Sequence, residues 1–183
     1  MSATLRERTI VPGRSPALLR ASVAIFLGWG GLLAVTGGLG AGVVARIMRE
    51  RFVFMSGRTD AVFFGRPLAE LYATDPALRD AVGIHMTMLS ATLGALGISV
   101  AALAWCGLRQ RSRAALVGLV LTPVPIVAWF LAVALSYAAK GAVISLADVP
   151  PFVWLGSLVA IIGGTLGWLA LRPISGPLTR SER

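Results

Sequence analysis

The sequence predicts an all-α membrane protein, in which four transmembrane helices form a bundle with an extracytoplasmic loop between helices 1 and 2. Hydrophobic residues make up 56% of the 183 positions and charged residues 14%, whereas soluble domains carry about a quarter charged residues. Stretches without Asp, Glu, Lys or Arg recur at 21–45, 84–108, 114–139 and 151–171. Each is long enough to cross a bilayer core of about 30 Å as a helix. We therefore expect a single membrane domain at 21–171.

The chain begins with a basic tail, residues 1–20, before the first expected span at 21–45. That span is about twice as long as the apolar core of a signal peptide, so we expect it to be retained. Gly38 and Gly42 lie four residues apart, which places two small residues on one face and allows another helix to approach closely. This face would pack against the chain's own helices or form a dimer interface.

The loop at 46–83 carries six arginines and five acidic residues, so its charge is nearly balanced. Basic residues favour the cytoplasmic side, and a balanced loop therefore fits the outer side. Its phenylalanines and Tyr72 favour a position on the membrane surface. The turn at 56–59 separates two apolar stretches, which indicates either a small hairpin or an outward extension of the first helix.

The second half of this loop has clearer helix signals. Leu68, Leu71 and Tyr72 have the spacing of one helix face behind Pro67, which predicts a short amphipathic helix. The pair at 75–76 is Asp-Pro, a typical helix start in which the carboxylate accepts from free amides. We expect that helix to continue into the second span at 84–108.

Arg109, Arg111 and Arg113 follow the second span directly and mark its cytoplasmic end. In the third span, 114–139, Pro123 and Pro125 each remove a backbone donor and predict a kink. A kinked helix either lines a cavity or serves packing alone.

The fourth span, 151–171, carries Gly163 and Gly167 as a second close-approach pair. It is followed by a tail at 172–183 that is again basic. Both termini are therefore expected on the cytoplasmic side.

Several function classes are disfavoured by composition. The spans hold no Asp, Glu, Lys or Arg, which argues against proton-coupled transport. Phosphate-binding glycine loops and Gly-x-Ser-x-Gly elbows do not occur. One histidine excludes a bis-histidine haem within one subunit, and the single Cys106 excludes an internal disulfide. The arginines sit at helix ends rather than on one soluble face, so no nucleic-acid partner is expected. We expect no cofactor and no catalytic residues.

His85, Met86 and Met88 open the second span at its outer end. Imidazole and thioether groups together suit a soft ion such as Cu(I), so these three residues are a candidate metal site. In the structural alternative the methionines fill apolar space and His85 bonds to a neighbour such as Asp80.

A second candidate site combines polar groups of the outer loop and the second span. Glu70, Tyr72, Asp80 and His85 are expected to converge there and to bind a small amphiphile or a polar group of a partner. Alternatively, these acids only neutralise nearby arginines on a solvated surface.

The segment Trp-Cys-Gly-Leu-Arg-Gln-Arg-Ser-Arg at 105–113 ends one span and turns into the next through basic residues. It resembles the inner loop of small bacterial four-helix membrane proteins, among them DoxX-like proteins. That resemblance implies redox-associated membrane complexes, although the lone Cys106 supplies no redox pair. The bias toward alanine, glycine and arginine is similar to that of proteins from high-GC bacteria, which implies the bacterial inner membrane.

These observations favour a non-enzymatic accessory or partner-binding subunit that contacts membrane lipid and another membrane protein or a second copy of itself. The first alternative is a binder or carrier of a small hydrophobic molecule or lipid, in a cavity near Pro123 and Pro125. A further alternative is an outer-face Cu(I) site at His85 and Met88, and an enzyme acting on a lipid ranks third, after the subunit and the carrier. A wide apolar cavity would favour the carrier, and a filled bundle with an exposed glycine stripe would favour the subunit.

Overall fold

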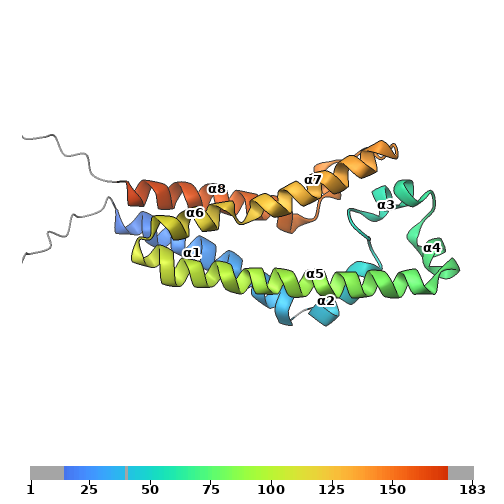
Figure 1. Cartoon of the computed structure of the whole chain (residues 1–183), viewed down its shortest axis with the longest axis horizontal. Coiled ribbons are helices and arrows are strands. Elements are labelled where there is room, and N and C mark those ends of the chain that lie inside the picture. Colours follow the sequence, from blue (N-terminus) through green and yellow to red (C-terminus); the bar gives the residue numbers. More distant parts are fainter. Residues whose placement is uncertain (1–14, 40, 173–183) are drawn as a thin grey trace, which may run out of the picture.

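The computed structural model describes residues 15–39 and 41–172, and every regular element in that part of the chain is helical. Four helices are long and apolar enough to cross a membrane: Pro16–Gly38, Pro76–Gln110, Arg113–Ala139 and Pro151–Leu171. They lie lengthwise beside one another as a bundle (Figure 1). The chain is thus a multi-pass membrane protein by the length and composition of these helices.

The first spanning helix ends earlier than its apolar stretch. Helix α1 (Pro16–Leu33) continues as the π-helical segment η1 (Ala34–Leu39), and the separate helix α2 (Ala41–Arg49) follows. The sequence predicted one span over 21–45. The helix changes its winding where Gly37 and Gly38 occur, because glycine weakens a regular helix and π-turns interrupt it locally.

Two short helices, α3 (Gly57–Phe64) and α4 (Leu68–Thr74), lie between α2 and the second spanning helix. The hairpin considered for this region is wrong. Ser56 instead caps α3, since its hydroxyl accepts from the Thr59 amide at 3.3 Å while the Thr59 hydroxyl accepts from the Ser56 amide at 3.1 Å. The amphipathic helix predicted after Pro67 is confirmed as α4. We call residues 50–75 the cap.

Helix α5 (Pro76–Ala102) is the second spanning helix, and its predicted start is confirmed. Asp75 accepts from the Leu78 amide at 3.1 Å, and Pro76 occupies the first turn. The helix continues through the π-helical segment η2 (Leu103–Gly107) and the short 3₁₀ segment η3 (Leu108–Gln110).

The third spanning helix is broken where the prolines predict a kink. Helix α6 (Arg113–Leu121) ends before Thr122, and α7 (Pro123–Ala139) begins directly after it. The 3₁₀ segment η4 (Leu146–Asp148) leads into the fourth spanning helix, α8 (Pro151–Leu171). In Figure 1, α7 diverges from α5 toward the cap, whereas α1 begins and α8 ends at the opposite end of the bundle. We call these the cap end and the terminal end.

Helices α1 and α5 are in backbone contact along a glycine seam. A Cβ added to Gly30 would lie 2.7 Å from the Gly97 carbonyl oxygen, and one added to Gly94 would lie 2.6 Å from the Gly38 nitrogen. Gly37 meets Gly94 in the same way. Between helices in a membrane there is no hydrophobic driving force, and small residues at such crossings allow close van der Waals contact instead.

Helix α8 packs on α1 through a buried hydrogen bond. The Ser22 hydroxyl, fully buried, donates to the Gly163 carbonyl oxygen at 2.6 Å. A Cβ on Gly163 would lie 2.8 Å from the ring of Phe26. The core at the terminal half of the bundle gathers around this contact and consists of Leu19, Val23, Phe26, Val100, Ala104, Leu108, Leu116, Leu119 and Ala170.

Candidate functional site

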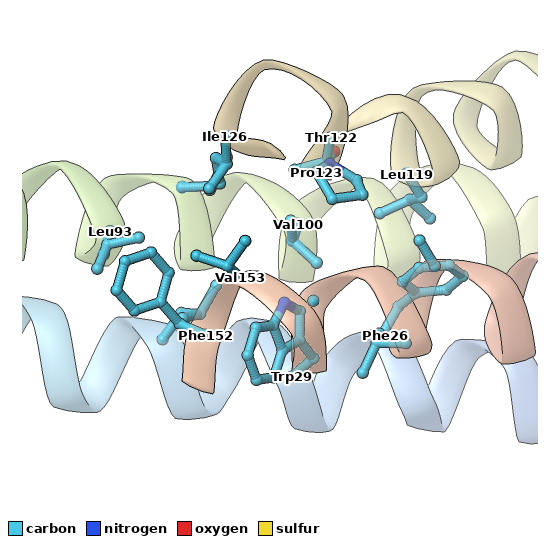
Figure 2. Close-up of a pocket in the computed structure, with 15 residues that line it drawn as sticks. Phe26, Trp29, Leu93, Val100, Leu119, Thr122, Pro123, Ile126, Phe152 and Val153 are labelled. Carbon is cyan, nitrogen blue, oxygen red and sulfur yellow. The ribbon is translucent and has the colours of Figure 1, made fainter. Parts of the chain in front are cut away.

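The space beside the kink is nearly filled. Fifteen residues line it, and they come from all four spanning helices (Figure 2). Phe26 and Trp29 extend from α1, Pro123 lies at the start of α7, and Val153 belongs to α8. The remaining volume is about 20 Å³, which accommodates about one water molecule. The position that the kink suggested therefore has no room for a hydrophobic ligand in this structure.

A larger apolar space opens toward the cap end, and we call it the cap-side cleft. It encloses about 290 Å³ and shares Trp29, Leu33, Leu93 and Phe152 with the filled space beside the kink. Its wall is formed by α1 with η1, α2, the cap, α5 and the start of α8. The remaining lining residues are Leu32, Thr36, Gly37, Met48, Phe52, Met86, Leu89, Ser90, Pro151 and Leu155.

The π-helical segment η1 contributes two residues to this cleft, Thr36 and Gly37. Short π-helical segments interrupt the regular side-chain pattern and occur often at functional sites. The Thr36 hydroxyl donates to the Leu32 carbonyl oxygen at 2.7 Å. Thr36 and Ser90 are the two hydroxyl-bearing residues of an otherwise apolar lining, and no charged residue belongs to it.

The cap is attached to α7 by a buried carboxyl group. Asp60 is fully buried, and its two oxygens accept from the Val53 amide and from the Tyr137 hydroxyl, each at 2.5 Å. Phe63 stacks on the Tyr137 ring with the centroids 4.3 Å apart. One turn of α3 thus carries both a polar and an aromatic contact to the third spanning helix.

Asp148, 5% exposed, provides the second attachment. It accepts from the Ser145 hydroxyl at 2.7 Å and the Ser145 amide at 2.8 Å. From the cap, the Ser56 hydroxyl and the Arg58 guanidinium each donate to it at 2.7 Å. Hydrogen bonds from Ser145 first, and then from Ser56 and Arg58, hold the pKa of Asp148 well below its usual range. The cap is therefore joined to the turn between α7 and α8.

The four polar residues expected to form a ligand site have different surroundings, and no hydrogen bond between them is seen among the described residues. Glu70 is exposed on α4, and Asp80 is exposed on α5. Tyr72 is buried among apolar residues, and its hydroxyl donates to the Arg49 carbonyl oxygen at 2.9 Å. The ring of His85 instead meets that of Phe54, with centroids 5.5 Å apart.

The three residues expected to bind copper face different surroundings. Met86 is 2% exposed and belongs to an apolar cluster with Tyr72 and Val82, whereas Met88 is 65% exposed. The buried Nε2 of His85 has no hydrogen-bond partner among the described residues. Met86 and Met88 are two positions apart on the helix, so their side chains project about 200° apart and the two sulfur atoms are separated. Groups of three or more His, Cys, Asp or Glu side chains with metal-binding geometry are absent from residues 15–39 and 41–172.

The predicted packing glycines fall into two groups. Gly163 faces the Phe26 ring, and a Cβ on Gly167 would lie 2.7 Å from a methyl carbon of Leu116. In contrast, a Cβ on Gly38 would meet nothing within 4 Å. For Gly42, on α2, the structure describes the helical backbone but not the surroundings. Sequence spacing did not identify the seam formed by Gly30 and Gly37 with Gly94 and Gly97, because several glycine pairs in α1 are equally compatible with close approach.

The basic turn has structural contacts at the terminal end. The Arg109 guanidinium lies 4.2 Å from the centroid of the Trp105 ring, a cation–π distance. Arg111 turns the chain with φ 62°, and Arg113 donates to the Leu171 carbonyl oxygen at 3.0 Å.

Sequence reasoning missed Asp60, Asp148 and Tyr137 as anchors of the cap. The Ser-x-x-Thr pattern at 56–59 was an available signal for the start of α3, because a hydroxyl residue before a helix caps it. For Tyr137 the signal was weaker: a phenol inside an apolar helix needs a hydrogen-bond partner.

Comparison of this chain with protein-family models, curated proteins and solved structures finds no match. The features of this chain that suggest a function are the cap-side cleft and the outer surface of α1.

Proposed function

We propose that this protein binds a small hydrophobic or amphiphilic molecule in the cap-side cleft and performs no enzymatic reaction on it. The observation that carries the proposal is the cleft itself, with a volume of about 290 Å³. Ligand sites in proteins are concave, mostly apolar and roughly 300–1,000 Å³ in volume. The cleft is just below that range, which fits a small hydrophobic molecule or part of a lipid chain.

The lining defines the chemistry of the ligand. Its side chains are almost entirely aliphatic, aromatic or thioether, with Thr36 and Ser90 as the exceptions. An uncompensated charge would be costly in such surroundings, so the bound portion is neutral. The two hydroxyl groups suit one polar group on an otherwise apolar molecule, since a few placed polar groups orient a ligand in an apolar site.

The cap gives the cleft a wall outside the spanning helices. Phe52 belongs to the cap and lines the cleft, and the contacts of Asp60 and Asp148 hold the cap in place. Ligand entry would therefore depend on the cap, which is anchored by polar contacts. An ordinary lipid-facing groove has no such wall. This dependence supports a dedicated site.

The test is retention of a co-purified small molecule after extraction in a mild detergent, measured by mass spectrometry. Thr36→Trp places a large ring in the cleft from an exposed position. Thr92→Trp is the matched control, because Thr92 is also exposed and also donates to the carbonyl four residues earlier, at 2.9 Å. The expected result is retention by the parent protein and by Thr92→Trp, with at least about tenfold loss in Thr36→Trp. Equal retention by the two variants, or no enriched molecule in the parent protein, would contradict the proposal.

The second candidate is an accessory subunit that binds another membrane protein or a second copy of itself. It is favoured by the outer surface of α1 and η1, where a Cβ on Gly28, Gly31 or Gly38 would meet nothing within 4 Å. Glycines on a lipid-facing surface permit a partner helix to approach closely. The same extraction separates the two functions, since stoichiometric recovery of a protein would favour the subunit. Replacing Gly28 and Gly31 by leucine is then expected to abolish that recovery without altering the thermal unfolding temperature.

We further propose that the membrane is a bacterial inner membrane and that both termini are cytoplasmic. Arg109, Arg111 and Arg113 support this orientation, because they lie at the end of the bundle where α1 begins and α8 ends.

A further inference from the structure

A second groove lies at the terminal end of the bundle, between α6 and α8. It encloses about 490 Å³ and is lined mainly by apolar residues of the two helices, with Arg172 at one end. An adjoining space of about 80 Å³ is lined by Arg113, Trp168, Leu171 and Arg172. Trp168 and Arg172 border both spaces, so the apolar groove and the two arginines form one continuous surface. We call it the terminal groove.

Small residues on α8 form the floor of the terminal groove. A Cβ on Gly164 would lie 2.6 Å from a methyl carbon of Val120 on α6. Ala160, one helical turn away, is 5% exposed. The two helices therefore lie close together at the floor, while the larger side chains of Val117, Ile161 and Trp168 form the walls.

The groove has the length of one membrane leaflet. From Ile161 to Arg172 the axis of α8 rises about 17 Å, at about 1.5 Å per residue. The hydrocarbon core of a bilayer is about 30 Å thick, so one leaflet accounts for about half of that. An acyl chain lying along the groove would thus place its headgroup beside Arg172, at the membrane surface. Trp168 lies one helical turn, about 6 Å, before Arg172, in the interfacial region where tryptophans are enriched.

The charge at the end of the groove is uncompensated by its own lining. Among the described residues, no acidic side chain lines either of the two spaces that make up the terminal groove. A comparable groove at the cap end contains Arg46 and Arg49, but Asp80 lies among its lining residues. In addition, Arg49 is paired with Glu50 at 3.1 Å. Of these two grooves, the terminal one is therefore suited to an anionic ligand.

We propose that the terminal groove binds an anionic phospholipid, with one acyl chain along α8 and the phosphate beside Arg113 and Arg172. Guanidinium groups form strong charge-assisted hydrogen bonds with phosphate oxygens, and basic pockets at the ends of spanning helices are typical sites for anionic lipid headgroups. The bond from Arg113 to the Leu171 carbonyl oxygen, at 3.0 Å, holds its side chain next to Arg172. The site is separate from the cap-side cleft, and the two share no lining residue.

The test is native mass spectrometry of the full-length protein in neutral detergent, titrated with phosphatidylglycerol or with phosphatidylcholine of the same acyl chains. We expect phosphatidylglycerol to bind at least about tenfold more tightly. Arg172→Gln should remove most of that preference, since a hydrogen bond to a charged group contributes about tenfold in affinity. Arg20→Gln is the control, because Arg20 is also exposed and lies on α1 at the same end of the bundle. Equal affinity for the two lipids, or an unchanged preference in Arg172→Gln, would overturn the proposal.

A second variant tests the apolar part and leaves both arginines in place. Thr165→Phe fills the groove from an exposed position, and Ser99→Phe introduces the same ring at an exposed position of α5. Thr165→Phe is expected to weaken phosphatidylglycerol binding, and Ser99→Phe to leave it unchanged. Tight binding of inorganic phosphate alone would identify a site for a free anion instead. A change from dimer to monomer in Thr165→Phe would identify an interface between two copies, and either result would refute the lipid proposal.

Discussion

Asp60 is a fully buried carboxyl group near the cap end of the bundle. A carboxylate that is removed from water loses its hydration, and this loss must be offset by other polar contacts. In Asp60 the offset comes from two neutral donors, the Val53 amide and the Tyr137 hydroxyl. The ion pairs seen in the described residues involve Asp148 and Glu50 instead.

Removing the Tyr137 hydroxyl should therefore weaken the attachment of the cap. Tyr137→Phe leaves the aromatic stack with Phe63 in place but deletes a hydrogen bond to a carboxylate, which contributes about 1.5–3 kcal/mol to the free energy of unfolding. Tyr72→Phe is the control, because its hydroxyl donates to a neutral backbone carbonyl and its loss should cost about 1 kcal/mol. Chemical denaturation in detergent measures both. Equal costs for the two variants would show that Asp60 has no special role.

The stability of the cap should depend on the ionisation of Asp148. Its pKa is lowered in the folded protein, chiefly by the Ser145 hydroxyl. The resulting stabilisation is complete above the unfolded pKa of about 3.9 and is lost as the pH falls from there toward the folded pKa. Asp148→Asn should therefore unfold more easily than the parent protein at pH 7, with the difference shrinking below about pH 4. Thermal unfolding between pH 7 and pH 3 checks this, and a difference independent of pH would contradict it.

At the scale of helices, α1 and its continuation η1 carry glycines on two different surfaces. Gly30 and Gly37 meet the backbone of α5, whereas Gly28 and Gly31 have open space in the direction of a Cβ. The apolar composition of a spanning helix does not distinguish these surfaces, because lipid and protein interior are equally apolar. The arrangement leaves one side of α1 for the bundle and the other for lipid or a partner.

Substitution of the two kinds of glycine should have opposite consequences for stability. Gly30→Ala forces α1 and α5 apart, since the new Cβ would lie 2.7 Å from the Gly97 carbonyl oxygen. The expected cost is about 1–3 kcal/mol, as for other overpacked sites. Gly28→Ala should be neutral or slightly stabilising, because alanine favours a helix over glycine by about 1 kcal/mol. Thermal unfolding of the two purified variants decides the matter, and equal destabilisation would disprove the seam.

The break between α6 and α7 changes the direction of the third spanning helix. Pro125 has no amide hydrogen to donate to the carbonyl of Leu121, so the regular helix is interrupted there. Beyond this point α7 diverges from α5, and the cap contacts α7 near its end through Asp60 and Phe63 (Figure 1). The kink thus affects where the end of α7 meets the cap. The space directly beside the kink is nearly filled.

In the whole molecule, the two proposed sites lie at opposite ends. The cap-side cleft is neutral and partly walled by the cap, whereas the terminal groove ends in Arg113 and Arg172. A bilayer with anionic lipid on its cytoplasmic side would match this polarity. The orientation of the protein in the membrane therefore decides which site faces the cytoplasmic leaflet.

Orientation is testable with introduced cysteines in a Cys106→Ser background. Glu70→Cys places a thiol on the exposed surface of α4, and Gln110→Cys places one in the exposed basic turn. With intact cells and a membrane-impermeant thiol reagent, we expect labelling at position 70 and none at 110, because arginine-rich turns stay in the cytoplasm. Disruption of the cells should make both positions reactive. The reverse pattern in intact cells would invert the topology.

The sequence by itself determined the number and approximate positions of the spanning helices, the start of α5 at Asp75 and Pro76, and the break before Pro123. These features depend on hydropathy over a window and on local backbone chemistry, which a short stretch of chain contains completely. The fourth helix, Pro151–Leu171, likewise occupies the range that its apolar residues indicate.

Only the tertiary structure decided how the cap attaches, which glycines face inward, and where the cleft opens. Asp60 and Tyr137 are 77 positions apart, and Ser56 and Asp148 are 92 apart, so no local pattern connects them. The inward surface of each spanning helix could not be predicted from the sequence either. These helices are apolar on all sides and lack the amphipathic pattern that marks the buried face of a soluble helix. In this protein, local chemistry defines the helices, whereas contacts distant in the sequence define the sites.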